Sequence, residues 1–242
     1  GRVTVSNLNV RSGASTKYRK IGSLSYNKRV TIVKTLKEWY KIKYNSGYGY
    51  VNRAYISTSS RDSKDLDGFL FVGDSFTNNI RKNINSNAKN TVIRAKGSVT
   101  AKYWINHFGQ MPANSSKIKG VILQIGINDI GERYNISNTK TLIKKLSKKY
   151  SNKTIYVHRL FPIGTKYKFG NKYTTQKQIK SYNASIKSYC STLKNVKYID
   201  ATSGFINSNG YLKYQDPEGL HISWQYLGKY YNNIEAAVNR VR

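Results

Sequence analysis

The run FLFVGDSFTNN at residues 69–79 is the feature that most constrains the fold of this chain. Four apolar residues that suit a strand lead into Gly73, Asp74 and Ser75, and polar residues compatible with a helix follow. Glycine allows a sharp strand-to-helix turn, and a serine at that turn lies at the helix N-terminus, where free N–H groups and the positive dipole end favour an anion. Ser75 is therefore either a helix cap, the commoner role, or a nucleophile.

Apolar strands and helical stretches alternate from this run to the C-terminus. Such alternation predicts a parallel sheet with helices on both faces, whose functional residues lie at the carboxyl ends of the strands. We expect strands at residues 69–73, 91–95, 120–126, 154–160 and 196–200. We expect helices at residues 76–85, 98–109, 138–150, 174–193 and 223–240.

Two later motifs add candidate catalytic groups. The run VILQIGIND at residues 121–129 is a buried strand with a polar tip, where the amide of Asn128 could donate to an oxyanion and Gly126 lets the backbone approach closely. A simple turn is the alternative interpretation of this tip. The run DPEGLH ends at His221, the only one of three histidines with acids beside it, and one of these acids could hold the tautomer of the ring.

Together these motifs resemble the SGNH (GDSL-like) hydrolases over nearly all of residues 66–242. The resemblance implies a flavodoxin-like α/β/α domain in which Ser75 is the nucleophile and His221 is the general base. It also implies an oxyanion hole made by the backbone N–H groups of Ser75 and Gly97 and the side chain of Asn128. Four of the chain's 11 Asp and Glu residues fall within the motifs, which in so basic a chain favours a functional site.

The acid of the site has two candidates. The family pattern usually has Asp three residues before the histidine, and this position is Glu218 here. Glu218 is one methylene longer than Asp but could still accept a hydrogen bond from the imidazole, so we prefer it. Asp216, five residues before His221, is the alternative.

Residues 1–60 have short alternating stretches separated by turn-forming residues, which predicts a small β-barrel. The runs LNVRSGAS, EWYKI and GYGYV resemble bacterial SH3 (SH3b) domains over about residues 3–57. In that family the role is attachment to cell-wall peptidoglycan or its neighbours. We assign Trp39 and Val51 to the core. Three tyrosines could offer flat faces to a glycan or a peptide stem: Tyr18, Tyr48 and Tyr50.

These two resemblances divide the chain into an SH3b domain at residues 1–58, a polar, Ser-rich linker at 59–66 and a hydrolase domain at 67–242. The net charge of +31 is shared, since residues 1–60 carry +11 and the remainder carries +20. A basic surface of this extent favours polyanions. We expect peptidoglycan or an anionic wall polymer as the partner, and no nucleic acid, because no nucleic-acid-binding motif accompanies the charge.

Other features limit the possible functions. The single Cys190 lies in a helical stretch and should be buried. No metal-ligand spacing, phosphate loop or dinucleotide motif is present in the sequence, so we expect neither a metal nor a cofactor. No run has the length of a membrane span. The chain starts at Gly1 without Met, as expected for a trimmed mature or recombinant fragment, and we favour a monomer.

The sequence thus predicts a secreted, wall-associated serine esterase of a Gram-positive bacterium. O-acetyl groups on peptidoglycan are the preferred substrate, followed by acyl or D-alanyl esters on anionic wall polymers. A non-catalytic wall-binding protein is an alternative, although Ser75, Asn128 and His221 are all present. An O-acetyltransferase is a second alternative, made less favourable because the sequence shows no membrane domain to supply an acyl donor.

Overall fold

The computed structural model describes residues 1–242 except 6, 26–27, 59–65, 132–134 and 168–173. Contacts between residues divide the chain into two compact units, residues 1–62 with 224–232 and residues 63–223 with 233–242. Nearly all of the linker expected at residues 59–66 lies outside the described residues.

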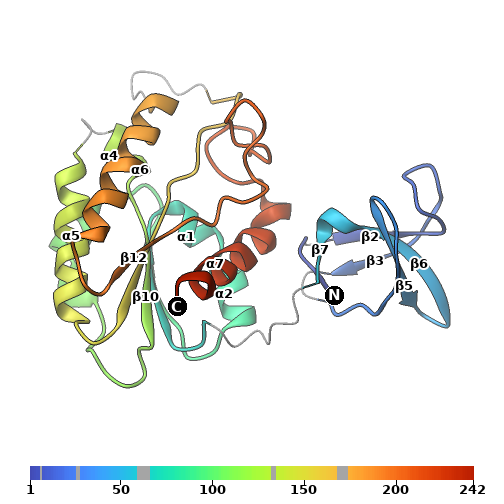
Figure 1. Ribbon diagram of the computed structural model, residues 1–242, viewed down its shortest axis with the longest axis horizontal. Helices are drawn as coiled ribbons and strands as arrows, with labels where there is room; N and C mark the ends of the chain where they lie inside the picture. The colour runs from blue at the N-terminus through green and yellow to red at the C-terminus, as the bar shows by residue number, and fades with distance from the viewer. Residues whose placement is uncertain (6, 26–27, 59–65, 132–134, 168–173) are drawn as a thin grey trace. The chain divides into compact units, whose positions relative to one another are not determined.

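The first unit is built from short antiparallel strands. A sheet has the order β3, β2, β6, β5, β4, and β1 pairs separately with β7 (Figure 1). This arrangement is the SH3-like all-β fold that the sequence predicts. The strands are β1 (Arg2–Val3), β2 (Asn7–Arg11), β3 (Lys20–Ser25), β4 (Ile32–Thr35), β5 (Trp39–Tyr44), β6 (Gly47–Asn52) and β7 (Ile56–Ser57), with a 3-10 turn, η1 (Arg53–Tyr55), before β7.

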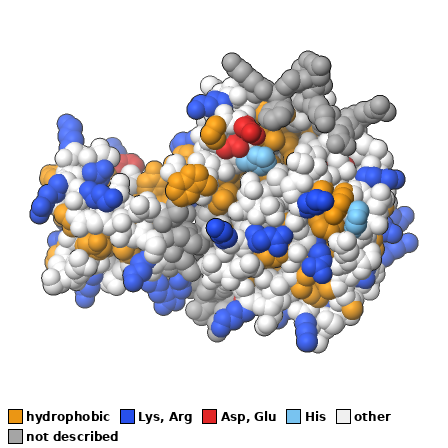
Figure 2. Space-filling model, turned by 180° about the vertical axis from the view of Figure 1, so that it is seen from behind, with side chains coloured by type: hydrophobic (Ala, Val, Ile, Leu, Met, Phe, Trp, Pro, Cys, Tyr) orange, Lys and Arg blue, Asp and Glu red, His pale blue; other side chains and the backbone are white. Residues whose placement is uncertain are grey.

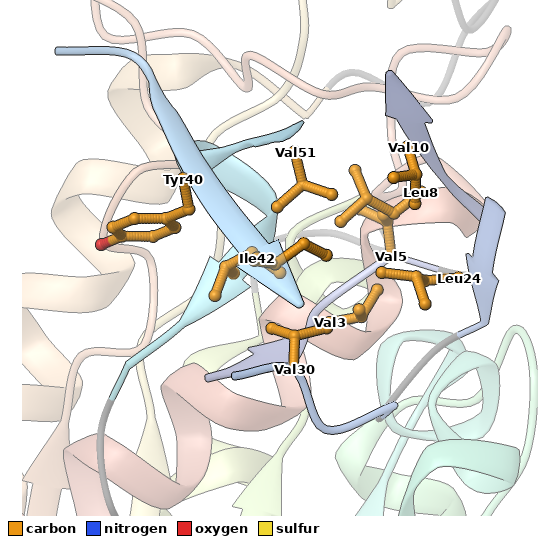
Figure 3. Close-up of a cluster of buried hydrophobic side chains, with 10 residues drawn as sticks. Val3, Val5, Leu8, Val10, Leu24, Val30, Tyr40, Ile42 and Val51 are labelled. Atoms are coloured by element: carbon orange, nitrogen blue, oxygen red, sulfur yellow. The ribbon is translucent and has the colours of Figure 1, made fainter. Parts of the chain in front are cut away.

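The core of this unit is a cluster of mostly aliphatic side chains from the strands (Figure 3). Val10, Ile42 and Val51 have no exposed surface, so the assignment of Val51 to the core is confirmed. The assignment of Trp39 is wrong, because its side chain is only half-buried. Side chains alternate along a strand, and the inward positions of β5 are those of Tyr40 and Ile42, which leaves Trp39 on the outer face.

The second unit contains a five-stranded parallel sheet: β8 (Phe69–Gly73), β9 (Val92–Ala95), β10 (Gly120–Gln124), β11 (Thr154–His158) and β12 (Val196–Ile199). Its order is β12, β11, β10, β8, β9, which is the flavodoxin-like order. Gly73 pairs with Gln124 on one side and Ala95 on the other. The segments that follow β8, β9 and β10 therefore leave the sheet side by side, at the point where the strand order reverses.

Helices cover both faces of this sheet, with α5 and α6 on one face and α1, α2 and the part of α7 from residue 233 on the other (Figure 1). Their apolar stripes face the sheet, as with the fully buried Leu142, Ile143 and Leu146 of α5. Cys190 of α6 is buried as predicted, and burial raises the pKa of its thiol to about 12. The helices are α1 (Ser75–Asn79), α2 (Arg81–Asn87), α3 (Ala101–Asn106), α4 (Ile127–Gly131), α5 (Ile136–Lys149), α6 (Gln176–Ser191) and α7 (Leu227–Val241), with 3-10 turns η2 (Phe108–Gln110) and η3 (Trp224–Tyr226).

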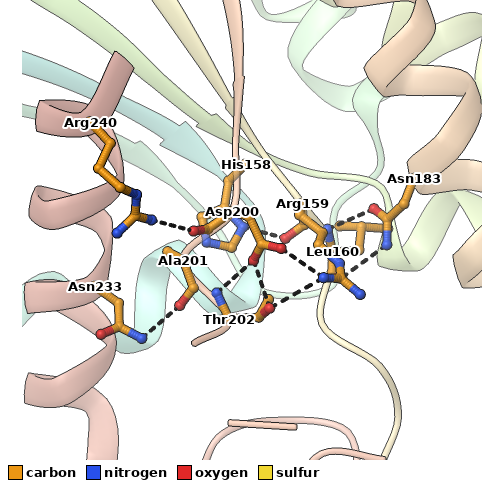
Figure 4. Close-up of polar contacts among 9 residues, drawn as sticks. All are labelled: His158, Arg159, Leu160, Asn183, Asp200, Ala201, Thr202, Asn233 and Arg240. Atoms are coloured by element: carbon orange, nitrogen blue, oxygen red, sulfur yellow. Dashed lines mark hydrogen bonds and ion pairs between the residues drawn. The ribbon is translucent and has the colours of Figure 1, made fainter. Parts of the chain in front are cut away.

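A polar network anchors the carboxyl ends of β11 and β12 (Figure 4). Arg159 forms a 2.7 Å ion pair with Asp200, which also accepts hydrogen bonds from the backbone and side chain of Thr202. Burial alone would raise the pKa of Asp200, but the hydrogen bonds from Thr202 and Arg159 outweigh it and hold the pKa below its usual value. Asn233 and Arg240 of α7 donate to backbone carbonyls at 201 and 200, which fixes this part of α7 beside the end of β12.

Candidate active site

The turn after β8 places Ser75 at the start of α1. Asp74 is the N-cap residue of α1, and its side chain accepts a hydrogen bond from the backbone N–H of Phe76 at 3.0 Å. A Cβ atom at Gly73 would lie 2.5 Å from the carbonyl oxygen of Gln124, so no larger residue fits there without displacing backbone. The glycine thus allows the close turn, the aspartate caps the helix, and Ser75 is left partly exposed.

The structure brings Ser75 and His221 together although they are 146 residues apart in the sequence. Ser75 Oγ lies 2.7 Å from His221 Nε2, which is hydrogen-bond distance. On the other side of the ring, His221 Nδ1 lies 3.3 Å from Asp216 Oδ2. The chain therefore presents serine, histidine and carboxylate in series, the arrangement needed to activate a hydroxyl group.

The distances favour Asp216, the alternative acid, as the partner of the histidine ring. The second oxygen of Asp216 accepts hydrogen bonds from the backbone N–H groups of Leu220 and His221, at 3.1 and 3.2 Å. Gly219 closes this turn with a φ of +77°, where a Cβ would lie 2.3 Å from the backbone nitrogen of Tyr167. The carboxylate of Glu218, by contrast, belongs to an exposed side chain.

The two other predicted oxyanion residues lie on the segments after β9 and β10. Gly97 is in the exposed turn that follows β9, and Asn128 is in α4, where a turn was the simpler expectation. Asn128 Nδ2 donates to the carbonyl oxygen of Val99 at 2.9 Å, and the N–H of Lys96 donates to the carbonyl oxygen of Gly73 at 3.4 Å. These contacts hold the 96–99 loop between the ends of β8 and β10.

Asp129 and Trp104 connect α3 with α4 and with the end of β8. Both carboxylate oxygens of the buried Asp129 accept hydrogen bonds from the N–H of Ala101, the first residue of α3, at 3.1 and 3.0 Å. Trp104 Nε1 donates to the carbonyl oxygen of Gly73 at 3.0 Å. Asp129 belongs to the sequence motif at residues 121–129, but the motif does not indicate that its side chain anchors the start of α3.

An aromatic stack lies against the candidate base, and no sequence motif indicates it. The rings of Phe76 and His221 are 5.0 Å apart, and Phe76 stacks on Phe161 at 5.6 Å with nearly parallel planes. Both phenylalanines are almost fully buried. The position of Phe76 directly after Ser75 was the available signal, whereas Phe161 is far away in the sequence.

Burial shifts the pKa values of two titratable groups, His158 and Asp74, in opposite directions. Burial lowers the pKa of His158 to about 4, so this histidine is neutral near pH 7 and buried away from solvent. Burial also raises the pKa of Asp74 to about 7, although the hydrogen bond from Phe76 opposes the shift. His221, by contrast, contacts the hydroxyl group of Ser75.

One group of potential metal ligands occurs among the described residues. It consists of Asp216, Glu218 and His221, whose ligand atoms lie within 4.8 Å of one another. Within the residues that the structure describes, no helix is long and apolar enough to cross a lipid bilayer.

Comparison with known proteins decides the family. A family model described as the GDSL-like lipase/acylhydrolase family matches residues 71–225, more than half of the chain. The chain belongs to this family. The GDSL-like domain is preceded by a match to the bacterial SH3 domain at residues 6–57. Both domain types are those that the sequence motifs predict.

Solved structures share the GDSL-like fold at low sequence identity. A Streptococcus pneumonia protein named for platelet activating factor is 19% identical, with a TM-score of 0.60 over 74% of this chain and 86% of that one. A GDSL-like lipase from Bacteroides thetaiotaomicron is 17% identical, with a TM-score of 0.56 over 78% and 91%. A family 3 carbohydrate esterase from Clostridium thermocellum is 17% identical, with a TM-score of 0.52 over 72% and 95%. At such identities the similarity concerns the fold alone.

A curated relative matches over a shorter stretch. Bacteriocin BCN5 from Clostridium perfringens is 53% identical over 49 residues, which is 20% of this chain and 6% of that protein. The chain thus spans only a small part of the length of this relative.

Proposed function

We propose that this protein is a serine esterase in which Ser75 is the nucleophile, His221 the general base and Asp216 the acid that orients the base. The observation that carries the proposal is the 2.7 Å contact between Ser75 Oγ and His221 Nε2. Asp216 lies at Nδ1 of the same ring and would favour the tautomer with a proton on Nδ1, which leaves Nε2 free to accept the serine proton.

The reaction then proceeds through an acyl-enzyme. Ser75 Oγ bonds to the acyl carbon while its proton passes to His221 Nε2. The ester C–O bond breaks, and the leaving alcohol takes that proton from His221. A water molecule, deprotonated in turn by His221, attacks the acyl-serine and releases the free acid, and Ser75 recovers its proton. The carboxylate of Asp216, next to Nδ1, stabilises the imidazolium ion.

The negative charge of the tetrahedral intermediate needs hydrogen-bond donors. We assign this role to the backbone N–H groups of Ser75 and Gly97 and to the side chain of Asn128. Asn128 has two amide hydrogens, and the hydrogen bond to Val99 uses one of them, so the other remains for the oxyanion. Donors of this kind each contribute about 10²–10³ in rate.

We further propose that the natural ester is an O-acetyl group on peptidoglycan or a related wall glycan. The bacterial SH3 domain suggests an extracellular or wall-related location, and the net charge of +31 favours anionic wall polymers. A carbohydrate esterase is among the proteins that share the fold. These features support a secreted protein that is attached to a Gram-positive cell wall. Its partner would be peptidoglycan or an anionic wall polymer.

The test is to incubate the purified protein with O-acetylated peptidoglycan and to measure released acetate, beside a small aryl acetate and a Ser75→Ala control. Acetate release that depends on Ser75 is the expected result. Hydrolysis of the aryl ester without release of acetate from the wall would support the esterase activity and contradict the proposed substrate. The absence of both would favour a wall-binding protein, and transfer of acetyl groups to a sugar instead of water would favour a transferase.

A further inference from the structure

A cationic side chain lies beside the candidate oxyanion hole and has no role in the mechanism above. Lys96 comes directly after β9 and directly before Gly97, and its side chain is exposed. Its backbone N–H donates to the carbonyl oxygen of Gly73, two residues before Ser75. Lys96 is therefore fixed at the carboxyl end of the sheet, next to the turn that carries the nucleophile.

The ammonium group of Lys96 rests on an aromatic surface. Its Nζ lies 4.8 Å from the centroid of the Tyr103 ring, and Tyr103 stacks on His107 with 4.1 Å between ring centroids. The neighbouring Trp104 donates to the same carbonyl oxygen of Gly73 as Lys96 does. An aromatic face restrains the position of a cation without neutralising its charge, so the charge stays available to a ligand.

A second cation lies at the same strand end. Arg81 donates from Nη2 to the carbonyl oxygen of Ala95 at 3.0 Å, and Ala95 is the residue before Lys96. Among the residues that the structure describes, neither Arg81 nor Lys96 has a carboxylate within ion-pair distance. The space-filling view shows two histidine side chains on one face, one of them beside acidic side chains, with Lys and Arg side chains between the two (Figure 2).

We propose that Lys96, with Arg81 beside it, forms a subsite for an anionic group of the ester substrate, a carboxylate or a phosphodiester. The inference rests on the proposed function and specifies its substrate class: an acyl ester on a negatively charged chain or sugar. An exposed ion pair in water contributes little, about two- to five-fold in affinity. The subsite therefore sets a preference among esters and leaves the chemical step unchanged.

The experiment compares esters that differ by one charge. The probes are 4-acetoxybenzoate, its neutral methyl ester and 4-acetoxyphenyl methyl phosphate, each hydrolysed by the full chain. Lys96→Gln should raise KM for the two anionic esters by roughly two- to five-fold and leave KM for the neutral methyl ester unchanged. Lys96→Glu should raise KM for the anionic esters further. Lys194→Gln, which removes an exposed charge just before the amino end of β12, is the matched control and should change none of the three.

Further variants separate the subsite from mere support of the loop. Tyr103→Phe keeps the ring under Lys96 and should preserve the preference for anionic esters, whereas Tyr103→Leu should weaken it. An equal loss on charged and neutral esters, or no change on either, would overturn the subsite. If hydrolysis of the neutral ester does not depend on Ser75, the proposed function itself fails, and this result is distinct from a failure of the subsite.

Discussion

At the residue scale, the contact between Ser75 and His221 makes the strongest prediction. Ser75→Ala and His221→Ala should each lower kcat for an aryl acetate by about 10⁴–10⁶, because the nucleophile and its base act as a unit. The circular dichroism spectrum should be unchanged, since both side chains are partly exposed and lie outside the hydrophobic core. Ser181→Ala, an exposed serine of α6, is the control and should keep full activity. More than a tenth of the wild-type rate in either site variant would rule out this assignment.

A second prediction concerns the acid. Asp216→Asn should reduce kcat much more than Glu218→Gln, because Asp216 contacts Nδ1 of the ring while Glu218 is exposed. Steady-state kinetics of both variants on an aryl acetate would compare the two losses. A larger defect in the Glu218 variant would restore the acid that spacing favours, and two active variants would leave a serine–histidine dyad.

Asn128→Ala is the third prediction. It should lower kcat by about 10²–10³ with little change in KM, if the amide stabilises charge that develops only in the transition state. Steady-state kinetics on a soluble ester separates the two parameters. A rise in KM alone would instead make Asn128 a residue that binds the substrate in its ground state.

The acid shows where sequence reasoning ends at this scale. A strand, a glycine and a helix start restrict the backbone around Ser75 to few arrangements, so its position is predictable, whereas its pairing with His221 is implied by the resemblance to the GDSL-like family. Spacing cannot show how the turn before His221 folds. One oxygen of Asp216 accepts two backbone N–H groups there, which directs the other oxygen to the ring. A count of residues before the histidine contains no information on that turn.

At the element scale, the start of α1 makes a prediction about stability and pH. Burial raises the pKa of Asp74 to about 7 in the folded state, above the usual value of 3.8. Unfolding between pH 4 and 7 therefore releases a proton, so this carboxyl group lowers the free energy of unfolding as pH rises through that range. Asp74→Asn removes the titration and keeps the shape. Chemical denaturation should show the stability of Asp74→Asn relative to wild type increasing from pH 4 to 7 and levelling above 7, and a constant difference would contradict the shift.

The elements themselves were largely predictable, and their ends were not. All five strands of the parallel sheet lie where the sequence predicts them. The signal is clearest for the central strands β8, β10 and β11, because a strand buried on both faces must be apolar. The helix expected at residues 76–85 is instead divided into α1 and α2 at Ile80. β10 ends at Gln124, two residues early, since Gly126 has a φ of +130° and begins the turn into α4. Hydrophobic periodicity carries no signal for such local backbone angles.

At the scale of the whole molecule, the positive charge is distributed unevenly along the sequence. Residues 133–199 contain 16 Lys and Arg residues and no Asp or Glu. Many of these side chains lie on α5 and α6, where Lys144, Lys148, Lys177, Lys180 and Lys187 are exposed. A surface of this kind attracts anionic polymers over a distance that salt shortens, from about 10 Å at 0.1 M to 3 Å at 1 M.

Wall binding by the full chain should therefore weaken as salt rises, while hydrolysis of a neutral soluble ester should not. The ester has no charge for the field to act on, and the contact between Ser75 and His221 is partly buried and short enough to resist screening. Wall binding is measured by sedimentation with insoluble wall material, and ester hydrolysis by steady-state kinetics. Both are measured from about 0.05 to about 1 M salt. Walls stripped of their anionic polymers are the matched control and should show less salt dependence. If binding to intact walls is unaffected by salt, contacts of the SH3 domain dominate the attachment, and the charge has no role in it.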